Sequence, residues 1–324
     1  MREAAHQVER RATADRRPWF AARVATRRFV RAVARVGRPL IGERAFEALY
    51  GLGRLGYLPR IEHPTTFAEK LLWLKRHYRH PLMPLLTDKL AVREHVAREA
   101  PECRTPIVYQ VAATATDFDF GSLPQRAVVK STHGSGHVAY WTPDADQAAL
   151  RRSIEGWLAT RYEAHANEWV YAGSTPRVFA EEDLRDGTGR PPVDFKFMVL
   201  NGVVHHVQVV EGRGERLAWR IFDRDWQLLP VLRPNVPGGP PSIPRGPPPE
   251  RPARLTTMLA VSERLGAQFP FVRIDFYVRD DALYIGEMTF FPASGHPEFI
   301  PASFDLELGR ALTLPPAQKT QEWR

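Results

Sequence analysis

The stretch from Phe269 to Gly295, FPFVRIDFYVRDDALYIGEMTFFPASG, decides how this sequence folds. Apolar residues recur on both sides of the Asp280-Asp281 pair, namely Val272, Ile274, Phe276 and Val278 before it and Leu283, Ile285 and Met288 after it. Alternation of this kind around a turn sequence predicts a β-hairpin. Asp275 and Glu287 fall on its two strands, so the hairpin is predicted to bring the two carboxylates side by side.

Two neighbouring carboxylates need a partner. They repel each other, so either one of them takes up a proton or both share a cation. Magnesium prefers one or two carboxylates together with phosphate oxygens, which fits this pair. The alternative is that Asp275 and Glu287 are outward-facing strand residues paired with Arg273 and Arg279. The residues alone favour neither interpretation, because short motifs often match by chance.

The composition is that of an ordinary globular protein. The 324 residues are 44% hydrophobic and 25% charged, enough for two or three subdomains around a sizeable core. The single cysteine, Cys103, can form neither an internal disulfide nor a zinc site, which favours a reducing compartment. We expect Cys103 to be a loop or packing residue.

The positive charge is concentrated at one end of the chain. Residues 1–60 contain 14 arginines and 5 acidic residues, a net charge of +9, whereas the whole chain carries +8. The remainder is therefore nearly neutral. This distribution argues against a nucleic-acid groove across the folded body and favours a basic attachment segment.

Between Trp19 and Val36, apolar residues are interleaved with arginines at helical spacing. The pattern predicts an amphipathic helix that lies on an anionic membrane surface or, alternatively, packs its apolar stripe on the body. No apolar run approaches the ~20 residues of a membrane span, and no signal peptide is visible. We expect a cytoplasmic protein with peripheral contact to the inner face of the membrane through residues 1–60.

The rest of the chain alternates between helical and strand-like segments. Residues 51–64 are rich in Gly and Pro and indicate a linker. Thr66 and Glu69 form a capping box that begins a helix, which Pro81 and Pro84 are expected to end. A second helix is expected from near Thr87 to just before Pro101. Further helices are predicted over 146–166 and 255–265, and residues 304–312 are expected to close the fold.

Strands are predicted where short apolar runs end in turn residues. They lie in TPIVYQV (105–111), RAVVK (126–130), HVAYW (137–141), PRVFAEEDL (176–184), DFKFMVLNG (194–202) and VVHHVQVVEG (203–212). Ten prolines between Pro230 and Pro252 predict a long irregular loop.

Three of these segments carry groups suited to anions. Lys130 ends a strand just before a glycine loop, where backbone N–H groups and an ammonium can hold phosphate; a plain hairpin turn is the alternative. Glu181 and Glu182 lie together at the end of a strand, where they act either as a cap or as ligand groups. Lys196 alternates with apolar neighbours, so it either faces a cleft with an anionic partner or lies on an edge strand.

Taken in this order, the motifs resemble the ATP-grasp superfamily, and within it the TupA-like branch named for teichuronopeptide biosynthesis. The resemblance also rests on TTFAEKLLWLK, TDKLAVREHV, KSTHGSGH, FAEEDL, FDRDWQLL, FPFVRIDFY and GEMTFFPASG, and it covers about residues 64 to 310. It implies an α+β ATP-grasp fold with nucleotide between two α+β subdomains. The expected segments are a basic helical region (1–60), a helical region (61–125), a central subdomain (126–186) and a C-terminal subdomain (187–324).

The resemblance also implies roles for individual residues. The nucleotide phosphates would be bound by Lys130 and Lys196 under a flap formed by Thr132, His133, Gly134, Ser135 and Gly136. Adenine would meet a hinge at Glu181, Glu182 and Leu184, largely through backbone groups. Arg273 would face the transferred phosphoryl group, and Asp275, Glu287 and Thr289 would bind Mg²⁺.

Two of these positions depart from the superfamily pattern. Thr289 stands where Asn is usual, which puts the second metal ion in doubt because a hydroxyl is a poorer ligand. Glu182 replaces the usual hinge Lys, so that adenine recognition depends more on the backbone.

The implied activity is that of a Mg-ATP-dependent carboxylate-amine ligase, which forms an amide through an acyl phosphate in cell-envelope polysaccharide or teichuronopeptide-type biosynthesis. Its substrates would be small-molecule or glycan-linked carboxylates and amines. The alternatives are a kinase of a sugar or small molecule, in which the acceptor is a hydroxyl, and a degenerate nucleotide-binding scaffold at the membrane. Candidates for the acceptor pocket, each of which could instead be a solvated residue, are His205, His206, Arg213, Arg216, Arg220 and His296.

Overall fold

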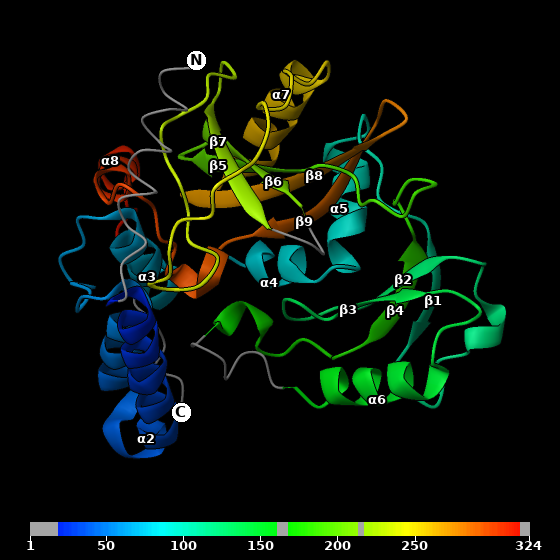
Figure 1. The fold of residues 1–324 in the computed structure, drawn as a ribbon, viewed down its shortest axis with the longest axis horizontal. Helices are drawn as coiled ribbons and strands as arrows, with labels where there is room; N and C mark the ends of the chain where they lie inside the picture. The colour runs from blue at the N-terminus through cyan, green and yellow to red at the C-terminus, as the bar shows by residue number, and fades with distance from the viewer. Residues whose placement is uncertain (1–18, 161–167, 213–216, 318–324) are drawn as a thin grey trace. The chain divides into compact units, whose positions relative to one another are not determined.

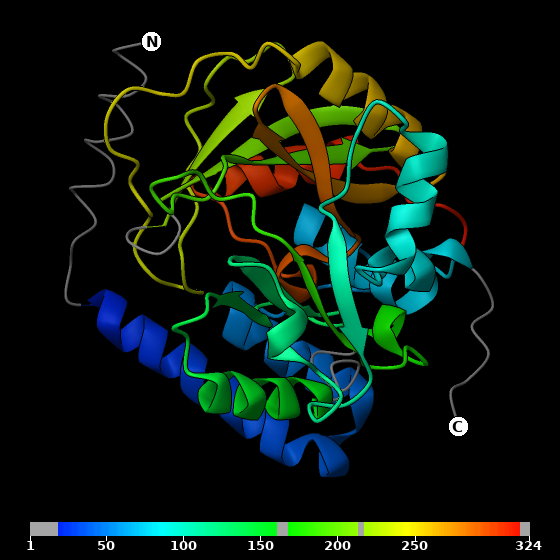
Figure 2. The same ribbon diagram turned by 90° about the vertical axis from the view of Figure 1, so that its right-hand side faces the viewer.

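The computed structural model describes residues 19–160, 168–212 and 217–317 (Figures 1 and 2). The chain forms two compact units, and each is made of segments that are distant in the sequence. Unit 1 comprises Met1–Arg79, Val193–Arg273 and Phe290–Arg324, and unit 2 comprises His80–Pro192 and Ile274–Thr289. Arg213 and Arg216, two of the predicted acceptor residues, lie outside the described residues.

Unit 2 contains an antiparallel four-stranded sheet that supports the predicted phosphate loop. Its order is β1-β4-β2-β3, with β1 (Val108–Ala112), β2 (Ala127–Ser131), β3 (Val138–Trp141) and β4 (Val178–Glu182). Helix α6 (Gln147–Leu158) covers one face, as Figure 1 shows, and begins where the Asp146 carboxylate accepts the Ala149 N–H at 2.9 Å. Ile154 of this helix shares a hydrophobic cluster with Val129 and Ala180, so the helix packs on the central strands β2 and β4.

Two short helices of unit 2 correct the sequence analysis. Pro84 does not end a helix; it lies inside α4 (Leu82–Thr87), where the first turn needs no N–H from a proline. The next helix, α5 (Ala91–Glu99), begins later than near Thr87 because the Asp88 carboxylate accepts the N–H groups of Leu90 and Ala91. The chain therefore turns over Asp88, Lys89 and Leu90, so that Lys89 lies between the two helices.

The predicted strands 194–202 and 203–212 form β5 (Asp194–Leu200) and β6 (Val203–Glu211) of a second sheet. Its order is β7-β6-β5-β8-β9, with β7 (Ala218–Asp223), β8 (Phe271–Arg279) and β9 (Ala282–Thr289), and the division between the units falls in β8 after Arg273. Strand β7 was not predicted. Asp280 and Asp281 between β8 and β9 have φ of 49° and 59°, the left-handed conformations of a tight hairpin turn.

Helices surround the part of the second sheet that belongs to unit 1. Helix α7 (Leu255–Gly266) packs on β5 and β6, and α3 (Phe67–His77) packs on α8 (Ser303–Ala311). The predicted capping box is confirmed, because Thr66 and Glu69 satisfy each other's backbone N–H groups. The region Pro230 to Pro252 is irregular, as predicted, apart from isolated bridges such as Leu232 with Ile300.

The N-terminal helix is longer than predicted and is part of unit 1. Helix α2 runs from Trp19 to Leu55 with a non-helical residue at Gly42, so the predicted linker over 51–64 begins with helix. Tyr50 is buried, and a Cβ on Gly53 would meet the Arg31 side chain at 2.6 Å, which explains the glycine. Arg27 donates to the carbonyls of Arg54 and Leu55 and to Glu298.

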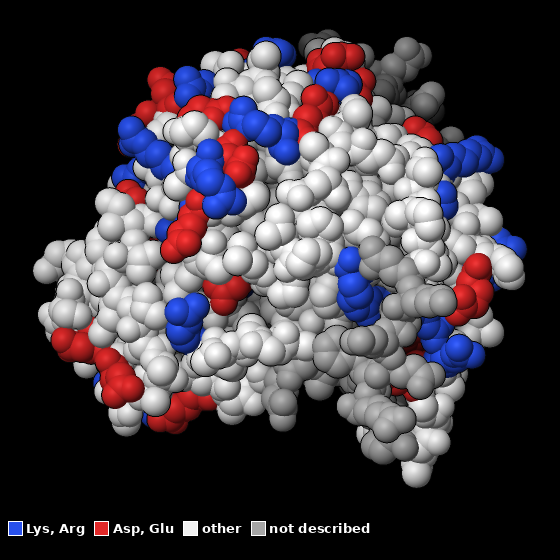
Figure 3. All heavy atoms as spheres, turned by 180° about the vertical axis from the view of Figure 1, so that it is seen from behind, with Lys and Arg blue, Asp and Glu red and all other residues white. Residues whose placement is uncertain are grey.

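None of the described helices is long and apolar enough to cross a membrane. On the face drawn in Figure 3, lysines and arginines lie among aspartates and glutamates, in keeping with the nearly neutral body expected from the sequence.

Candidate functional site

The predicted phosphate loop follows β2 in unit 2 and is held at its first residue. Thr132 is fully buried; its N–H donates to the Arg177 carbonyl at 2.9 Å, and its hydroxyl accepts the Arg177 N–H at 3.2 Å. Gly134 and Gly136 have φ of 80° and 82°, conformations that side chains rarely adopt. His133 is buried as well, whereas Ser135 and Gly136 are exposed. The loop therefore has a fixed base and an exposed glycine tip.

Lys89 fastens this loop and was missed by the sequence analysis. Its backbone N–H donates to the Thr132 carbonyl at 3.2 Å, and its Nζ donates to the Gly134 carbonyl at 2.6 Å. Burial lowers the pKa of Lys89, and the charge of Lys130 lowers it further, while the carboxylate of Glu287 opposes the shift. The signal in the sequence was TDKLAVREHV, a motif that contributed to the resemblance without a role for its lysine.

Glu181 is the counter-ion of this cationic cluster. Only 3% of the residue is exposed, and its carboxylate accepts the Lys130 ammonium at 2.5 Å and the guanidinium of Arg93 from α5. Arg93 also donates to the Pro106 carbonyl and lies over the Phe179 ring. The predicted hinge residue thus has a carboxylate that binds two cations, and Lys130 is held where β2 and β4 pair.

The hinge after β4 is anchored to its neighbours. The Glu182 N–H donates to the Ile107 carbonyl at 2.8 Å, and the Glu182 carboxylate accepts the Ile107 N–H at 3.2 Å. The side chain that replaces the superfamily lysine is therefore engaged with the backbone that leads into β1. Leu184 is buried beyond it.

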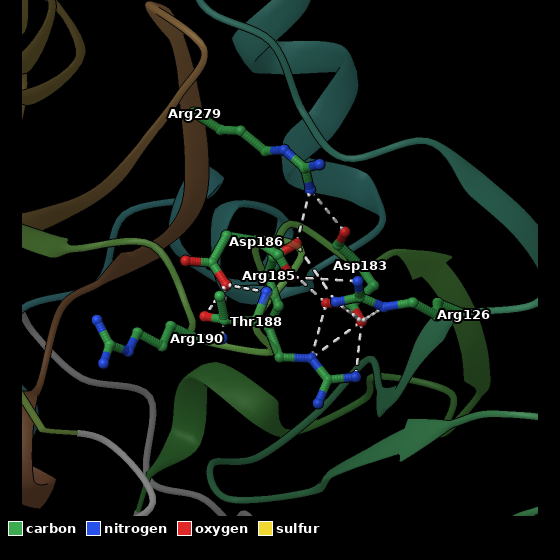
Figure 4. A network of polar contacts seen from close by, with 7 residues as sticks. All are labelled: Arg126, Asp183, Arg185, Asp186, Thr188, Arg190 and Arg279. Atoms are coloured by element: carbon green, nitrogen blue, oxygen red, sulfur yellow. Dashed lines mark hydrogen bonds and ion pairs between the residues drawn. The ribbon is translucent and has the colours of Figure 1, made fainter.

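Asp183 organises a polar network around this hinge (Figure 4). Its side chain is 2% exposed and accepts Arg126 Nε at 3.0 Å and Arg185 Nη2 at 2.7 Å. Burial alone would raise the pKa of Asp183, but the hydrogen bonds from Arg185 outweigh it and hold the pKa below its ordinary value. The Arg185 guanidinium also lies 3.9 Å above the Tyr140 ring.

Arg279 joins the same network from the end of β8. Its Nη1 donates to the carbonyls of Asp183 and Arg185 at 3.0 and 3.1 Å, as Figure 4 shows. Asp186 closes the following turn by accepting the N–H groups of Thr188 and Arg190. The hinge backbone on both sides of Leu184 is thus fixed by side chains from three separate segments.

The predicted metal ligands belong to unit 2 as well. Asp275 is 1% exposed, Glu287 is half-buried, and the Thr289 hydroxyl donates to Glu287 Oε1 at 3.2 Å. Within the described residues, no group of three or more His, Cys, Asp or Glu side chains could hold a metal ion. Two carboxylates and a hydroxyl fit Mg²⁺ that brings its own phosphate and water ligands, because this ion seldom relies on protein ligands alone.

Lys196 and Arg273 belong to unit 1, whereas the predicted nucleotide-loop, hinge and metal residues belong to unit 2. Lys196 is 4% exposed, and its Nζ lies 3.1 Å from Oδ2 of the fully buried Asp194. Lys196 is therefore a buried lysine with an anionic partner, as one of the two interpretations of the sequence required. Unit 2 unites Lys130, the loop, the hinge and the acidic residues.

The described acceptor candidates differ in their surroundings. Both Nη groups of Arg220 are engaged, because Nη1 binds both Glu211 oxygens at 2.7 and 2.6 Å and Nη2 binds two loop carbonyls. His206 is fully buried and binds Gln208, and burial holds the pKa of His206 and of His296 well below the usual value. His205 is partly buried beside His206. Trp226 is 8% exposed and stacks on Phe222, so it belongs to the core.

Comparison with known proteins gives a match over most of the chain. The family model described as TupA-like ATPgrasp matches residues 69–313. No curated protein matches the sequence. Among solved structures, an L-amino acid ligase from Bacillus licheniformis is 13% identical, with a TM-score of 0.46 over 79% of this chain and 57% of that one.

D-alanine-D-alanine ligases are also similar. The enzyme from Bacillus anthracis is 16% identical, with a TM-score of 0.37 over 64% of this chain and 57% of that one. The enzyme from Helicobacter pylori is 13% identical, with a TM-score of 0.40 over 76% and 69%. The chain thus spans about 57% of the length of the two Bacillus ligases.

Proposed function

Because this chain belongs to the TupA-like ATP-grasp family, as its motifs predicted, we propose that it is an ATP-dependent carboxylate-amine ligase. The observation that carries the proposal is the cluster in unit 2 in which Lys89 binds the Gly134 carbonyl and Lys130 shares Glu181 with Arg93. Three cations beside a glycine loop form a site for a polyphosphate.

The nucleotide contacts follow from this arrangement. The ammonium groups of Lys89 and Lys130 neutralise the phosphates, and the N–H groups from Thr132 to Gly136 approach them where glycine leaves the backbone open. Adenine meets the backbone of Glu182 and Leu184. The position of that backbone is important for adenine binding, because the Glu182 side chain binds the Ile107 N–H and does not replace the contact of the usual hinge lysine.

In this proposal Asp275, Glu287 and Thr289 would hold Mg²⁺, which would supply charge neutralisation for phosphoryl transfer. A substrate carboxylate oxygen attacks the γ-phosphorus, the bond to the bridging oxygen breaks, and ADP leaves. Arg273 and Lys196 offset the charge on the transferring group. An amine then attacks the acyl carbon, loses a proton and displaces phosphate, which leaves an amide.

The biological setting is proposed from the branch and from α2. The ligase acts on small-molecule or glycan-linked substrates in cell-envelope polymer synthesis, in the cytoplasm at the inner face of the membrane. Phe29, Val33, Val36 and Leu40 follow one another at helical spacing on α2 and are 68%, 48%, 82% and 90% exposed. This apolar stripe stands among arginines, the combination that binds anionic lipid surfaces.

The first test is the thermal shift of the purified protein with ATP, with and without Mg²⁺. A ligand at about 100 times its dissociation constant stabilises a protein by roughly 2.7 kcal/mol. We expect a Mg-dependent shift that Lys130→Ala removes. The absence of any shift at millimolar nucleotide would refute the nucleotide site and leave the scaffold alternative.

Product analysis then separates the ligase from a kinase. A ligase releases free phosphate and forms an amide, whereas a kinase keeps the phosphoryl group on its product. Transfer of the label from γ-³²P-ATP to a stable phosphorylated product would overturn the ligase proposal and establish the alternative.

A further inference from the structure

Arg233, in the proline-rich loop of unit 1, is a guanidinium without an acidic partner. Its Nη1 donates to Gln208 Oε1 at 2.6 Å, and its guanidinium lies 4.5 Å from the Trp219 ring centre and 5.5 Å from that of Phe299. Its Nε is buried with no hydrogen-bond acceptor, and no described residue accepts from its Nη2. The Nε and Nη2 edge is thus unused, and no described carboxylate forms an ion pair with it.

The surrounding structure holds this side chain in place. Gln208 is 1% exposed, and its Nε2 lies 3.0 Å from Nε2 of the fully buried His206. The Arg233 carbonyl accepts the Ser242 N–H at 2.9 Å, and the adjacent Leu232 exchanges two backbone hydrogen bonds with Ile300. The guanidinium is therefore positioned by Gln208 of β6 and by the backbone hydrogen bonds of Leu232 and Arg233, although Arg233 belongs to an irregular loop.

The electrostatics of this position favour an anion. Burial, together with the neighbouring charge of Arg273, lowers the pKa of Arg233 to about 10, with only partial compensation from Glu298. Glu298 itself is bound by Arg27 at 2.7 Å and by the Gly238 N–H. A desolvated guanidinium with a second one nearby is costly unless an anion joins it.

We propose that the Nε and Nη2 edge of Arg233 binds a carboxylate of the substrate, which makes the substrate of this ligase an acidic compound. That the bound carboxylate belongs to a ligase substrate rests on the proposed function. That Arg233 binds a carboxylate does not. Nε and one Nη form the planar fork that matches the two oxygens of a carboxylate. The Trp219 and Phe299 rings shield the fork from water and strengthen the pair.

Arg220, on β7, provides a contrast. It is 6% exposed, but its Nη1 binds both oxygens of Glu211 and its Nη2 binds the carbonyls of Arg245 and Gly246. Both Nη groups of Arg220 thus already bind protein acceptors. The sequence analysis proposed Arg220 for the acceptor pocket, whereas the structure assigns that role to Arg233.

The test follows the Nε–H resonance of Arg233 by ¹H-¹⁵N NMR of the full chain while succinate is added. The resonance is assigned by its loss in Arg233→Lys, and that of Arg220 by its loss in Arg220→Lys. We expect a saturable shift of the Arg233 signal and a stationary Arg220 signal. Succinamide, which has the same shape without charge, is expected to shift neither.

Gln208→Glu provides a variant that keeps Arg233 in place. It puts a carboxylate beside Nη1, so Arg233 acquires an internal partner, and the succinate dissociation constant should rise about tenfold or more. Circular dichroism of each variant verifies the fold. An Arg233 signal that ignores succinate, or that responds equally to chloride or succinamide, would overturn the inference.

The outcome is separable from that of the ligase proposal. A Mg-ATP thermal shift together with an unresponsive Arg233 would overturn the carboxylate site alone. A responsive Arg233 without any nucleotide effect would instead remove the ligase and leave an acid-binding protein.

Discussion

Asp183→Asn tests whether the polar network in Figure 4 positions the proposed adenine hinge. The substitution preserves the shape of the side chain but removes the charge that Arg126 and Arg185 share. The Arg279 bonds persist, because they end on backbone carbonyls rather than on the carboxylate. The hinge therefore keeps one attachment and loses the other.

The magnitude follows from exposure. The Asp183 side chain is 2% exposed, whereas those of Arg126 and Arg185 are 38% and 19% exposed. Breaking a fully buried ion pair costs about 3–5 kcal/mol and an exposed pair is worth about 0.2–1 kcal/mol, so a loss of about 2 kcal/mol is expected here. In a protein of this size that lowers the melting temperature by roughly 5 °C.

The effect should depend on pH in one direction. The pKa of Asp183 in the folded protein lies below its ordinary value of 3.8. Its contribution is therefore complete above about pH 4 and is lost as the pH falls through the folded value. Wild type and Asp183→Asn should differ in stability at pH 7 and converge in strong acid.

The assay is thermal unfolding at several pH values, followed by ATP titration. Asp144→Asn is the control, because it removes an exposed carboxylate from the same unit and should leave the melting temperature nearly unchanged. We expect a looser hinge to weaken ATP binding about fivefold, or about 1 kcal/mol. A melting temperature equal to that of wild type would refute the energetic reasoning, and unchanged ATP affinity would refute the positioning role.

Four further predictions address other parts of the chain. Lys89→Met should weaken ATP binding about tenfold in calorimetry, because one charge-assisted contact is lost; equal affinity would remove Lys89 from the site. Glu287→Gln should lower Mg-dependent ATP turnover at least roughly 100-fold, a reading that undiminished turnover would contradict. Burial raises the pKa of Asp305 to about 6, so stability should fall by up to about 3 kcal/mol between pH 4 and pH 6 and then level off, and Asp305→Asn should abolish this step in urea titrations. Phe29→Asp combined with Val36→Asp should reduce sedimentation with anionic vesicles without changing the Mg-ATP thermal shift, and undiminished sedimentation would exclude the α2 stripe.

Local patterns in the sequence predicted the elements whose causes are local. The alternation around Asp280-Asp281 predicted the β8 and β9 hairpin, and Thr66 with Glu69 predicted the start of α3. The family resemblance is confirmed by the match over residues 69–313. These features depend on neighbours within a few positions, and therefore a single sequence reveals them.

The features that were missed depend on distant parts of the chain. Pro84 is compatible with both a helix start and a helix end, and only the packing of unit 2 selects the start. Lys89 acquires its role from the carbonyl of Gly134, which lies 45 positions further along the chain. Arg233 stands out only because its hydrogen-bond partner is the amide of Gln208 on β6 rather than a carboxylate. No pattern of spacing records such contacts.

The carboxylate of Glu181 has a consequence for selectivity. Because it binds both Lys130 and Arg93, any incoming anion competes with a group that belongs to the protein and is always at full local concentration. A weak monoanion cannot displace it, whereas a triphosphate offers several oxygens at once. If a nucleotide binds at this cluster as proposed, Glu181 would act as a competing ligand that disfavours chloride and inorganic phosphate relative to a triphosphate.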